Sequence, residues 1–144
     1  MICGFFNDYR WLSNFWQCKI TYEGLTYSSV ENAYQAAKTV IQEERLPFLN
    51  VHAVRAKRLG KKLTLRPDWE NVKLDVMLDL LRLKFAHEEL KKKLLDTGEE
   101  YLEETNNWYD FYWGVCNGTG YNHLGKLLMQ VRNESKINDK SRTN

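Results

Sequence analysis

Apolar residues at helical spacing run through most of this chain after residue 29. The longest such stretch follows Pro67-Asp68, where a large apolar side chain recurs every three or four residues. Its members are Trp69, Val72, Val76, Leu80 and Leu83. Similar spacing predicts shorter helices over 29–41 and near 51–59, a turn or two that ends at Gly98, and a last helix that starts at Asn122 or His123. The chain must therefore bury most of its apolar surface between packed helices.

Strands are predicted for residues 2–27. Two runs of β-forming residues, 19–22 and 25–27, lie on either side of Glu23-Gly24. A two-residue turn that ends in glycine between such runs is typical of a β-hairpin. Before the hairpin, we expect the aromatic rings to pack inward and the intervening Ser13 and Asn14 to face something polar. The rings belong to Trp11, Phe15 and Trp16.

The composition is that of one soluble globular domain, with 144 residues, 43% of them hydrophobic and 28% charged. The net charge of +2 gives no support for broad binding to nucleic-acid phosphates, and we interpret the basic runs 55–62 and 91–93 as solvated helix faces. Three widely spaced cysteines without a CxxC pair favour a reducing compartment. The sequence shows neither a signal peptide nor a span-length apolar stretch, so we expect a cytoplasmic protein with no membrane partner.

Several familiar catalytic motifs are absent from the sequence. Gly118-Thr119-Gly120 resembles part of a dinucleotide fingerprint, but the third glycine falls only at Gly125 and no βαβ unit surrounds it. There is no Walker loop, no HExxH and no GxSxG motif, and the three histidines are not at metal-ligand spacing. These absences argue against redox, kinase and metallohydrolase functions, so we expect no metal and no redox cofactor.

A polar stripe lies along the predicted 29–41 helix. At about 100° per residue, Glu31, Gln35 and Lys38 fall on one narrow face beside the apolar stripe. They should therefore be half-buried at the edge of the core, where desolvation can lower the pKa of a lysine. The plainer alternative is that Glu31 only closes a capping box with Ser28 and that Lys38 is an ordinary rim lysine.

The segment 106–122 is an aromatic and glycine-rich loop. Tyr112 and Trp113 offer flat faces for a heterocycle or a sugar. The loop's glycines allow backbone N–H groups to approach phosphate oxygens closely, and they are Gly114, Gly118 and Gly120. The alternative is a tight loop around a buried tryptophan.

Arg66 is a further candidate for a phosphate contact. A guanidinium group can hold a phosphate through two parallel hydrogen bonds. It can equally pair with Asp68 or Glu70, which follow closely in the chain. The residue types leave both roles open.

An ordered set of motifs covers nearly the whole chain, from about Phe6 to Arg132. The motifs are LSNF at 12–15, SVENAYQAAK at 29–38, AKRLG at 56–60, RPDW at 66–69 with Lys73 and Met77, KF at 84–85, LLDTG at 94–98, DFYWG at 110–114 and GYNHLGKLLM at 120–129. In this order they resemble the NADAR family, also called YbiA-like. No single motif decides the resemblance, but the ordered set is highly specific.

The resemblance implies a single compact, mostly helical α+β domain over residues 1–132, with a few short N-terminal strands. The polar tail 133–144 is expected to fray. The implied activity is that of an N-glycosidase acting on an N-ribosidic bond. One branch of the family hydrolyses phosphorylated ribosylamino-pyrimidine intermediates of riboflavin synthesis, and another removes ADP-ribose from guanine bases of nucleic acid. The alternative is a non-catalytic module that binds ADP-ribose or another NAD-derived nucleotide.

Matched position by position, the resemblance assigns roles to particular residues. Glu31 and Lys38 match the family's helix glutamate and lysine, and Asp110 matches its loop acid, which gives three catalytic candidates. The matches at substrate-binding positions are Asn14, Trp113 and Asn122, to which we add Gln35, Arg66, Tyr112, Gly114 and Gly120. The chain departs from the family where Val115-Cys116-Asn117 follow the Trp-Gly pair and where Asn32 replaces a frequent histidine.

Two chemical routes can break an N-ribosidic bond at such a site. A carboxylate, from Glu31 or Asp110, can stabilise positive charge at C1′ or activate a water. Alternatively, the sugar opens to an imine and the neutral amine of Lys38 takes over C1′ as a Schiff base before hydrolysis. We favour a shared site in which Lys38 attacks and Glu31 moves protons.

Overall fold

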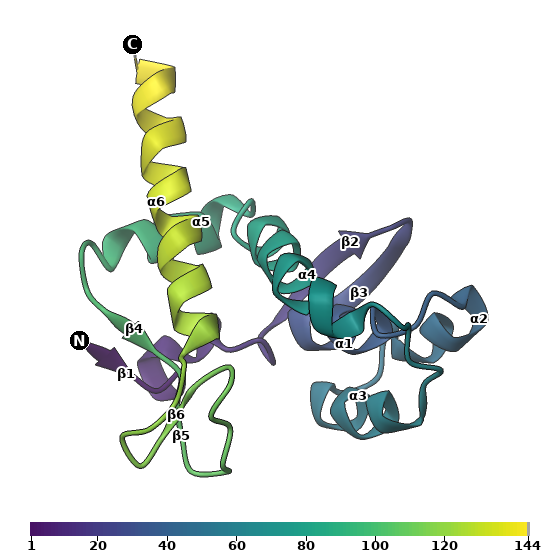
Figure 1. Ribbon diagram of the computed structural model, residues 1–144. Coiled ribbons are helices and arrows are strands. Elements are labelled where there is room, and N and C mark those ends of the chain that lie inside the picture. The colour runs from purple at the N-terminus through teal and green to yellow at the C-terminus, as the bar shows by residue number, and fades with distance from the viewer. Residues whose placement is uncertain (144) are drawn as a thin grey trace. The chain divides into compact units, whose positions relative to one another are not determined.

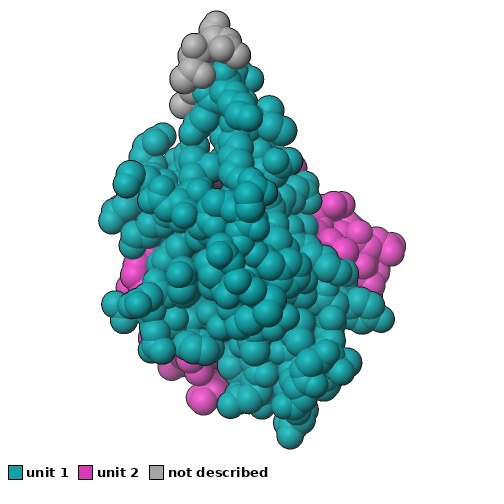
Figure 2. Space-filling model, turned by 90° about the vertical axis from the view of Figure 1, so that its left-hand side faces the viewer, with its two compact units in different colours: residues 1–13, 85–144 teal, residues 14–84 magenta. Residues whose placement is uncertain are grey.

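Residues 14–84 form one compact unit, and residues 1–13 together with the chain from residue 85 onward form another (Figure 2). The structure is a computed structural model that describes residues 1–143. Each unit has its own buried apolar side chains, and each is described here by itself.

Helices dominate both units (Figure 1). In residues 14–84 the elements are β2 (Gln17–Tyr22), β3 (Leu25–Ser29), α1 (Val30–Ala36), α2 (Gln42–Arg45), the 3-10 helix η2 (Leu46–Phe48), α3 (Ala53–Leu59), η3 (Gly60–Lys62) and α4 (Trp69–Lys84). The elements of the other unit are β1 (Ile2–Cys3), η1 (Asn7–Leu12), α5 (Glu88–Asp96), β4 (Leu102–Glu103), β5 (Thr105–Asn106), β6 (Val115–Cys116) and α6 (His123–Thr143). The mostly helical α+β fold with a few short strands is confirmed.

The strands pair two at a time within the described residues. β2 and β3 are antiparallel, whereas β1 pairs with β4 and β5 pairs with β6 in parallel. No helix between residues 1 and 143 combines the length and the apolar composition that a membrane crossing requires.

The predicted hairpin is confirmed and leads directly into α1. Glu23 and Gly24 have φ values of 49° and 85°, which are the left-handed conformations that a two-residue hairpin turn needs. Ile20 and Tyr27 face each other across the ladder and are both buried. Because β3 runs into α1 without a linker, the hairpin fixes the start of the helix that carries Glu31.

α1 begins one residue later than the predicted capping box requires. Its N-cap is Ser29, whose Oγ accepts a hydrogen bond from the Asn32 N–H at 3.1 Å. The prediction that Ser28 caps the helix with Glu31 is wrong, because Ser28 still belongs to β3 and donates its N–H to the Leu49 carbonyl. Asn32 therefore occupies the N3 position, where a capping box has Glu or Gln. Capping does not account for Glu31, which is at N2.

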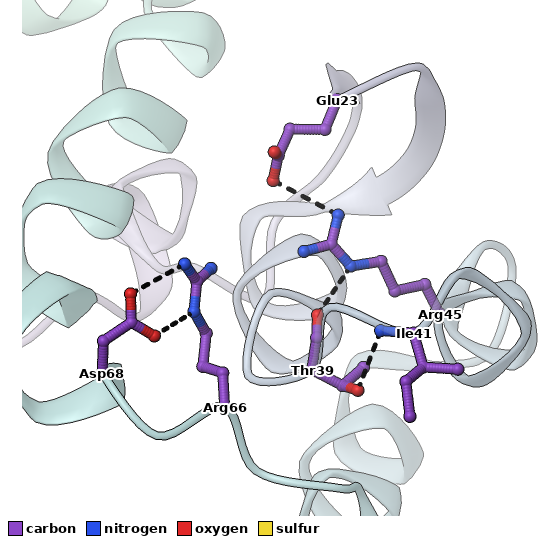
Figure 3. A network of polar contacts seen from close by, with 6 residues as sticks. All are labelled: Glu23, Thr39, Ile41, Arg45, Arg66 and Asp68. Carbon is purple, nitrogen blue, oxygen red and sulfur yellow. Dashed lines mark hydrogen bonds and ion pairs between the residues drawn. The ribbon is translucent and has the colours of Figure 1, made fainter.

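α1 also ends earlier than residue 41, so the predicted 29–41 helix is too long. Lys38 and Thr39 donate their N–H groups to carbonyls three residues back, as in a tight final turn. Their own carbonyls bind groups from farther along the chain. The Arg66 N–H donates to the Lys38 carbonyl at 2.7 Å. Arg45 Nε donates to the Thr39 carbonyl at 2.9 Å (Figure 3). Lys38 consequently lies in the turn that follows α1.

The first residues form less strand than predicted. β1 has two residues, and the 3-10 helix η1 begins soon afterwards at Asn7, which has a φ of 53°. Trp11 is buried as predicted, but Phe15 is 37% exposed, so the prediction that it packs inward is wrong. Asn14, the first residue of the unit 14–84, is buried although its side chain is polar.

α4 confirms the helix that was predicted after Pro67-Asp68. Its buried side chains are Trp69, Val76, Met77, Leu80, Leu81 and Lys84. Leu83 is 37% exposed because it falls beside this stripe and not on it. α1 packs against α4 and against α3 (Figure 1).

α3 starts later than predicted. Its N-cap is His52, whose ring accepts a hydrogen bond from the Val54 N–H. The helix stops at Gly60 as predicted. Gly60 is buried, and its φ of −59° means that close packing, not a left-handed turn, explains the glycine.

α6 starts at His123 as predicted but runs on to Thr143, so the expectation that the chain frays from Asn133 is wrong. Side chains from the middle and the second half of α6 are tied to α5 and to the segment that follows it. The pairs are Arg132 with the Glu100 carbonyl, Lys136 with Glu99, and Asp139 with Lys91. A domain boundary at residue 132 remains a prediction.

Candidate active site

Asn14, Glu31 and Gln35 form a buried polar cluster in the unit of residues 14–84. Glu31 is 7% exposed and Gln35 is 4% exposed. Gln35 Nε2 donates a hydrogen bond to Glu31 Oε1 at 2.8 Å, and the Glu31 N–H donates to the Asn14 carbonyl at 3.0 Å. The early loop is thereby fastened to the first turn of α1. A buried carboxylate oriented by an amide is well suited to move a proton to or from a bound ligand.

Two buried oxygen atoms of this cluster have no partner among residues 1–143. They are Asn14 Oδ1 and Gln35 Oε1. Asn14 Nδ2 reaches only Met77 Sδ, a weak acceptor, at 3.5 Å. The Gln35 amide lies against Gly60, where an added Cβ would stand 1.9 Å from Oε1. Unpaired buried acceptors are costly, so these two atoms are candidates for contact with a ligand.

Lys38 lies half-buried just beyond the end of α1. Its Nζ stands 5.6 Å from the centre of the Tyr34 ring, and among residues 1–143 this amine has no hydrogen bond or ion pair. Burial lowers the pKa of Lys38 from its usual value, against the opposite effect of the Glu31 charge. A lower pKa leaves more of the amine neutral, which is the nucleophilic form. The predicted helical stripe does not extend to Lys38, yet Glu31 still acts on it electrostatically.

Arg66 binds Asp68 through two hydrogen bonds (Figure 3). Nε to Oδ1 measures 2.7 Å and Nη2 to Oδ2 measures 3.1 Å. Of the two roles that the sequence leaves open, the structure shows the ion pair with Asp68. The same residue's N–H holds the Lys38 carbonyl, so this pair lies at the turn that carries Lys38. A substrate contact by Arg66 remains a prediction, for which Nη1 is the nitrogen not engaged by Asp68.

In the other unit, Asp110 shapes the aromatic loop. Its Oδ1 accepts hydrogen bonds from the N–H groups of Tyr112 and Trp113, at 3.1 and 2.9 Å. Asn106 holds the same turn from the opposite side, because its Oδ1 accepts from the Asp110 N–H and its Nδ2 donates to the Asp110 carbonyl. These contacts give Asp110 a structural role in addition to the catalytic one that the resemblance implies.

Two substitutions at Asp110 separate these roles. Asp110→Asn keeps an oxygen for the two N–H groups, so we expect its free energy of unfolding to stay within about 0.5 kcal/mol of the wild type. Asp110→Ala removes that acceptor and should cost about 1–2 kcal/mol in urea denaturation. Wild-type turnover by Asp110→Asn would assign the residue to the loop alone. A stable but inactive Asp110→Asn would show that the carboxylate itself is needed.

Asn122 and two of the glycines are packed into the loop's own backbone. Asn122 Oδ1 accepts from the Glu104 N–H and its Nδ2 donates to the Leu102 carbonyl, both at 2.9 Å. A Cβ on Gly114 would stand 2.1 Å from the Glu104 carbonyl oxygen, and one on Gly120 would stand 2.1 Å from the Gly114 carbonyl oxygen. Close backbone packing therefore accounts for glycine at both positions, and their contact with a phosphate remains a prediction.

Tyr112 and Trp113 belong to a cluster of rings. Their ring centres are 4.9 Å apart in an edge-to-face arrangement, and the His123 ring is 4.5 Å from that of Tyr112. Tyr121 stacks on His123 at 5.4 Å and is itself 65% exposed. Both predicted stacking residues are half-buried, so each still presents part of its surface to a ligand.

Lys84 is a buried amine that the sequence analysis did not single out as a site residue. It is fully buried on α4, and burial lowers its pKa to about 7, with the nearby Cys18 acting in the opposite direction. Spacing could have found it, because Lys84 follows Leu80 by four residues and Leu81 by three and so continues the apolar stripe. With no exposed surface, Lys84 cannot meet a ligand as Lys38 can.

Lys84 should make the stability of the protein depend on pH. Its folded pKa of about 7 lies below the usual lysine pKa of 10.5, so between these pH values the unfolded chain binds more protons than the folded one. The free energy of unfolding must then rise with pH, by up to about 1.4 kcal/mol per pH unit for one proton. Chemical denaturation from pH 7 to 8.5 should show this rise in the wild type and a flatter profile in Lys84→Met. Parallel profiles would contradict it.

The predicted site residues therefore fall into two groups, one in each unit. One group lies around α1 and the turn that follows it, and its members are Asn14, Glu31, Gln35, Lys38 and Arg66. The other group lies in the aromatic loop and just before α6, and its members are Asp110, Tyr112, Trp113, Gly114, Gly120 and Asn122. In the part of the chain that the structure describes, no group of three or more His, Cys, Asp or Glu residues is placed to hold a metal ion.

Comparison with known proteins gives one consistent match. The NADAR domain matches residues 5–136. N-glycosidase YbiA of Escherichia coli (strain K12) is 39% identical over 137 residues, which are 91% of this chain and 84% of that protein. N-glycosidase Npun_R5314 of Nostoc punctiforme is 38% identical over 134 residues, which are 88% of this chain and 85% of that protein.

A longer relative and a solved structure extend the match. The riboflavin biosynthesis protein VVA0006 of Vibrio vulnificus is 36% identical over 134 residues, which cover 88% of this chain but only 36% of that protein. The NMR structure of the E. coli protein YbiA superposes with a TM-score of 0.82 at 37% identity, over 92% of this chain and 82% of that one.

Proposed function

This chain belongs to the NADAR domain family, and we propose from that membership and from the chemistry around α1 that it is an N-glycosidase. The reaction is hydrolysis of an N-ribosidic bond. Relatives named N-glycosidase support the reaction class, and they match this chain over most of both lengths.

One observation carries the proposal: a buried carboxylate in the first turn of α1 acts electrostatically on an amine in the turn that follows the helix. Lys38 has a lowered pKa and no hydrogen-bonding partner among residues 1–143, while the buried Glu31 acts on it electrostatically. A structural lysine would more often be solvated or paired. Perturbed groups of this kind cluster at catalytic sites, where a nucleophile and a proton carrier must cooperate.

In the proposed mechanism, the ribosyl ring opens so that C1′ becomes an imine carbon. The neutral amine of Lys38 adds to C1′ and loses a proton to the Glu31 carboxylate. Glu31 passes that proton to the base nitrogen as the bond from C1′ to this nitrogen breaks, which leaves an imine between C1′ and Lys38. Water then hydrolyses the imine on Lys38, which releases the sugar aldehyde and restores the amine. The unpaired oxygens of Asn14 and Gln35 accept hydrogen bonds from ribose hydroxyl groups.

Two substrates fit this chemistry. One is a phosphorylated ribosylamino-pyrimidine, which the name of the riboflavin biosynthesis relative supports, although this chain spans only about a third of that protein. The other is guanine in nucleic acid that carries ADP-ribose, which the family resemblance suggests. Both present an N-ribosidic bond to C1′ and a phosphate farther along the sugar.

A product assay tests the proposal. The purified protein is given each substrate separately, and mass spectrometry follows the release of ribose 5-phosphate or of ADP-ribose. We expect one of the two products from the wild type and none from Lys38→Met. If the folded wild type releases neither but still binds ADP-ribose, the protein is a non-catalytic ADP-ribose-binding module.

A further inference from the structure

The basic run 55–62 is exposed on α3 and η3, as its composition predicts, and α3 packs against α1. It contains five cations and no acid, and all five side chains are exposed: Arg55, Lys57, Arg58, Lys61 and Lys62. The structure fastens this run to α1 through Gly60, since a Cβ there would stand 1.9 Å from Gln35 Oε1 and 2.8 Å from the Gln35 amide carbon. The backbone of the run therefore touches the residue that hydrogen-bonds Glu31.

The charges of two lysines of the run, Lys57 and Lys61, act on Lys38. Lys57 is in the last turn of α3 and Lys61 follows four residues later in η3, a spacing that brings two side chains to one face of a helical segment. Both charges oppose protonation of the Lys38 amine and so contribute to its lowered pKa. Lys73, on α4, acts on Lys38 as well but is already paired with Glu70 at 2.6 Å.

Lys57 and Lys61 have no ion pair among residues 1–143, although both stand near a third amine. Like charges brought together without an acid repel one another, so this arrangement opposes the fold and does not support it. An anion bound at the same place would remove the repulsion. The nearby carboxylate of Glu31 does not serve, since it is buried and held by Gln35.

We propose that Lys57 and Lys61 form a phosphate subsite that holds the phosphate or pyrophosphate of a ribosyl ligand while its C1′ lies at Lys38. The inference rests on the proposed function for the position of C1′, and it adds the class of ligand that the site selects. Lysines bind a phosphate as point charges without demanding one geometry, so the subsite suits either a terminal monophosphate or a pyrophosphate. An unphosphorylated ribosyl ligand has nothing to place there.

Charge-matched variants test the subsite. The double variant Lys57→Gln/Lys61→Gln removes the proposed contacts, and Arg55→Gln/Lys62→Gln removes the same charge from the same run as a control. Calorimetry measures the Kd of ribose 5-phosphate and of ADP-ribose for each variant. We expect the first double variant to bind both about tenfold more weakly than the control does, from two partly screened charge contacts. Equal affinities in the two double variants, or no binding of either compound to the wild type, would overturn the subsite.

Turnover separates this inference from the proposed function. In an active enzyme at the high-pH plateau of the rate, where Lys38 is neutral in every variant, KM for the phosphorylated substrate should rise about tenfold in Lys57→Gln/Lys61→Gln. There kcat should change by less than about twofold, because the contact is made equally in the ground and transition states. Below the plateau kcat should fall as well, because the loss of these charges raises the pKa of Lys38. Turnover with an unchanged KM would overturn the subsite alone. Weakened binding of ADP-ribose together with a wild type that turns over neither substrate would refute the N-glycosidase and retain the subsite.

Discussion

Lys38→Met is expected to lower turnover by at least about a thousandfold, because it removes the amine that takes over C1′ and keeps the length of the side chain. Lys38→Arg should be equally inactive, since a guanidinium group keeps the charge but is protonated at all accessible pH values. Steady-state assays with the preferred substrate measure both. The wild-type rate should rise with pH and level off below the usual lysine value of 10.5, because the pKa of Lys38 is lowered and the neutral amine is the reactive form.

A matched lysine shows whether the effect belongs to Lys38. Lys62→Met removes an exposed lysine of the same unit and should leave turnover unchanged. Circular dichroism and thermal melting confirm that each variant is folded. If Lys38→Met keeps a substantial fraction of wild-type turnover, the Schiff-base route is refuted and only direct attack by water remains.

Glu31→Gln should give the second largest loss, about a hundredfold to a thousandfold in kcat, because the proton carrier is removed. The shape is retained, and an amide oxygen can still accept the hydrogen bond from Gln35 Nε2. The substitution has a second consequence. The Glu31 charge raises the pKa of Lys38, so its removal should lower that pKa further and move the levelling of the rate to lower pH.

The pH profile distinguishes the role of Glu31 from a purely structural one. Glu43→Gln, at an exposed carboxylate of the same unit, is the matched control and should change neither kcat nor the profile. A loss of kcat in Glu31→Gln without any movement of the profile would argue against the coupling between Glu31 and Lys38. An unchanged kcat would exclude Glu31 as the proton carrier.

Local chemistry made several features predictable. Glu23-Gly24 between β-forming runs predicted the hairpin, and apolar spacing after Pro67 predicted α4. In both cases the determining contacts lie within a few residues along the chain. The order of motifs predicted the family, because each motif marks a different part of one domain.

The end of α1 was not predictable from local pattern. The carbonyls that a longer helix would use are held by Arg45 and by the N–H of Arg66, which is 28 positions beyond Lys38 by their numbers in the sequence. The β-branched residues 39–41 were a local warning, since such residues lose side-chain freedom in a helix. At the start of the helix, Ser28 and Ser29 are both good N-cap residues, so the sequence alone did not distinguish which of them caps α1.

The loop residues show a different limit. Composition marked Asp110 and Asn122 as polar groups beside rings, but it could not show that their side chains hold backbone groups of the same unit. Lys84 was overlooked for the opposite reason, because a charged residue at an apolar position is usually discounted as core. Around α1, in contrast, the polar residues chosen from the sequence do lie together.

Trapping of the intermediate on the protein tests the central claim most directly. The wild type is incubated with substrate and sodium cyanoborohydride, which reduces an imine to a stable amine, and peptide mapping by mass spectrometry locates the added sugar. The account predicts a ribosyl-phosphate or ADP-ribosyl adduct on the peptide that contains Lys38, absent from Lys38→Met. Product release at the full rate with no adduct on Lys38 would contradict it.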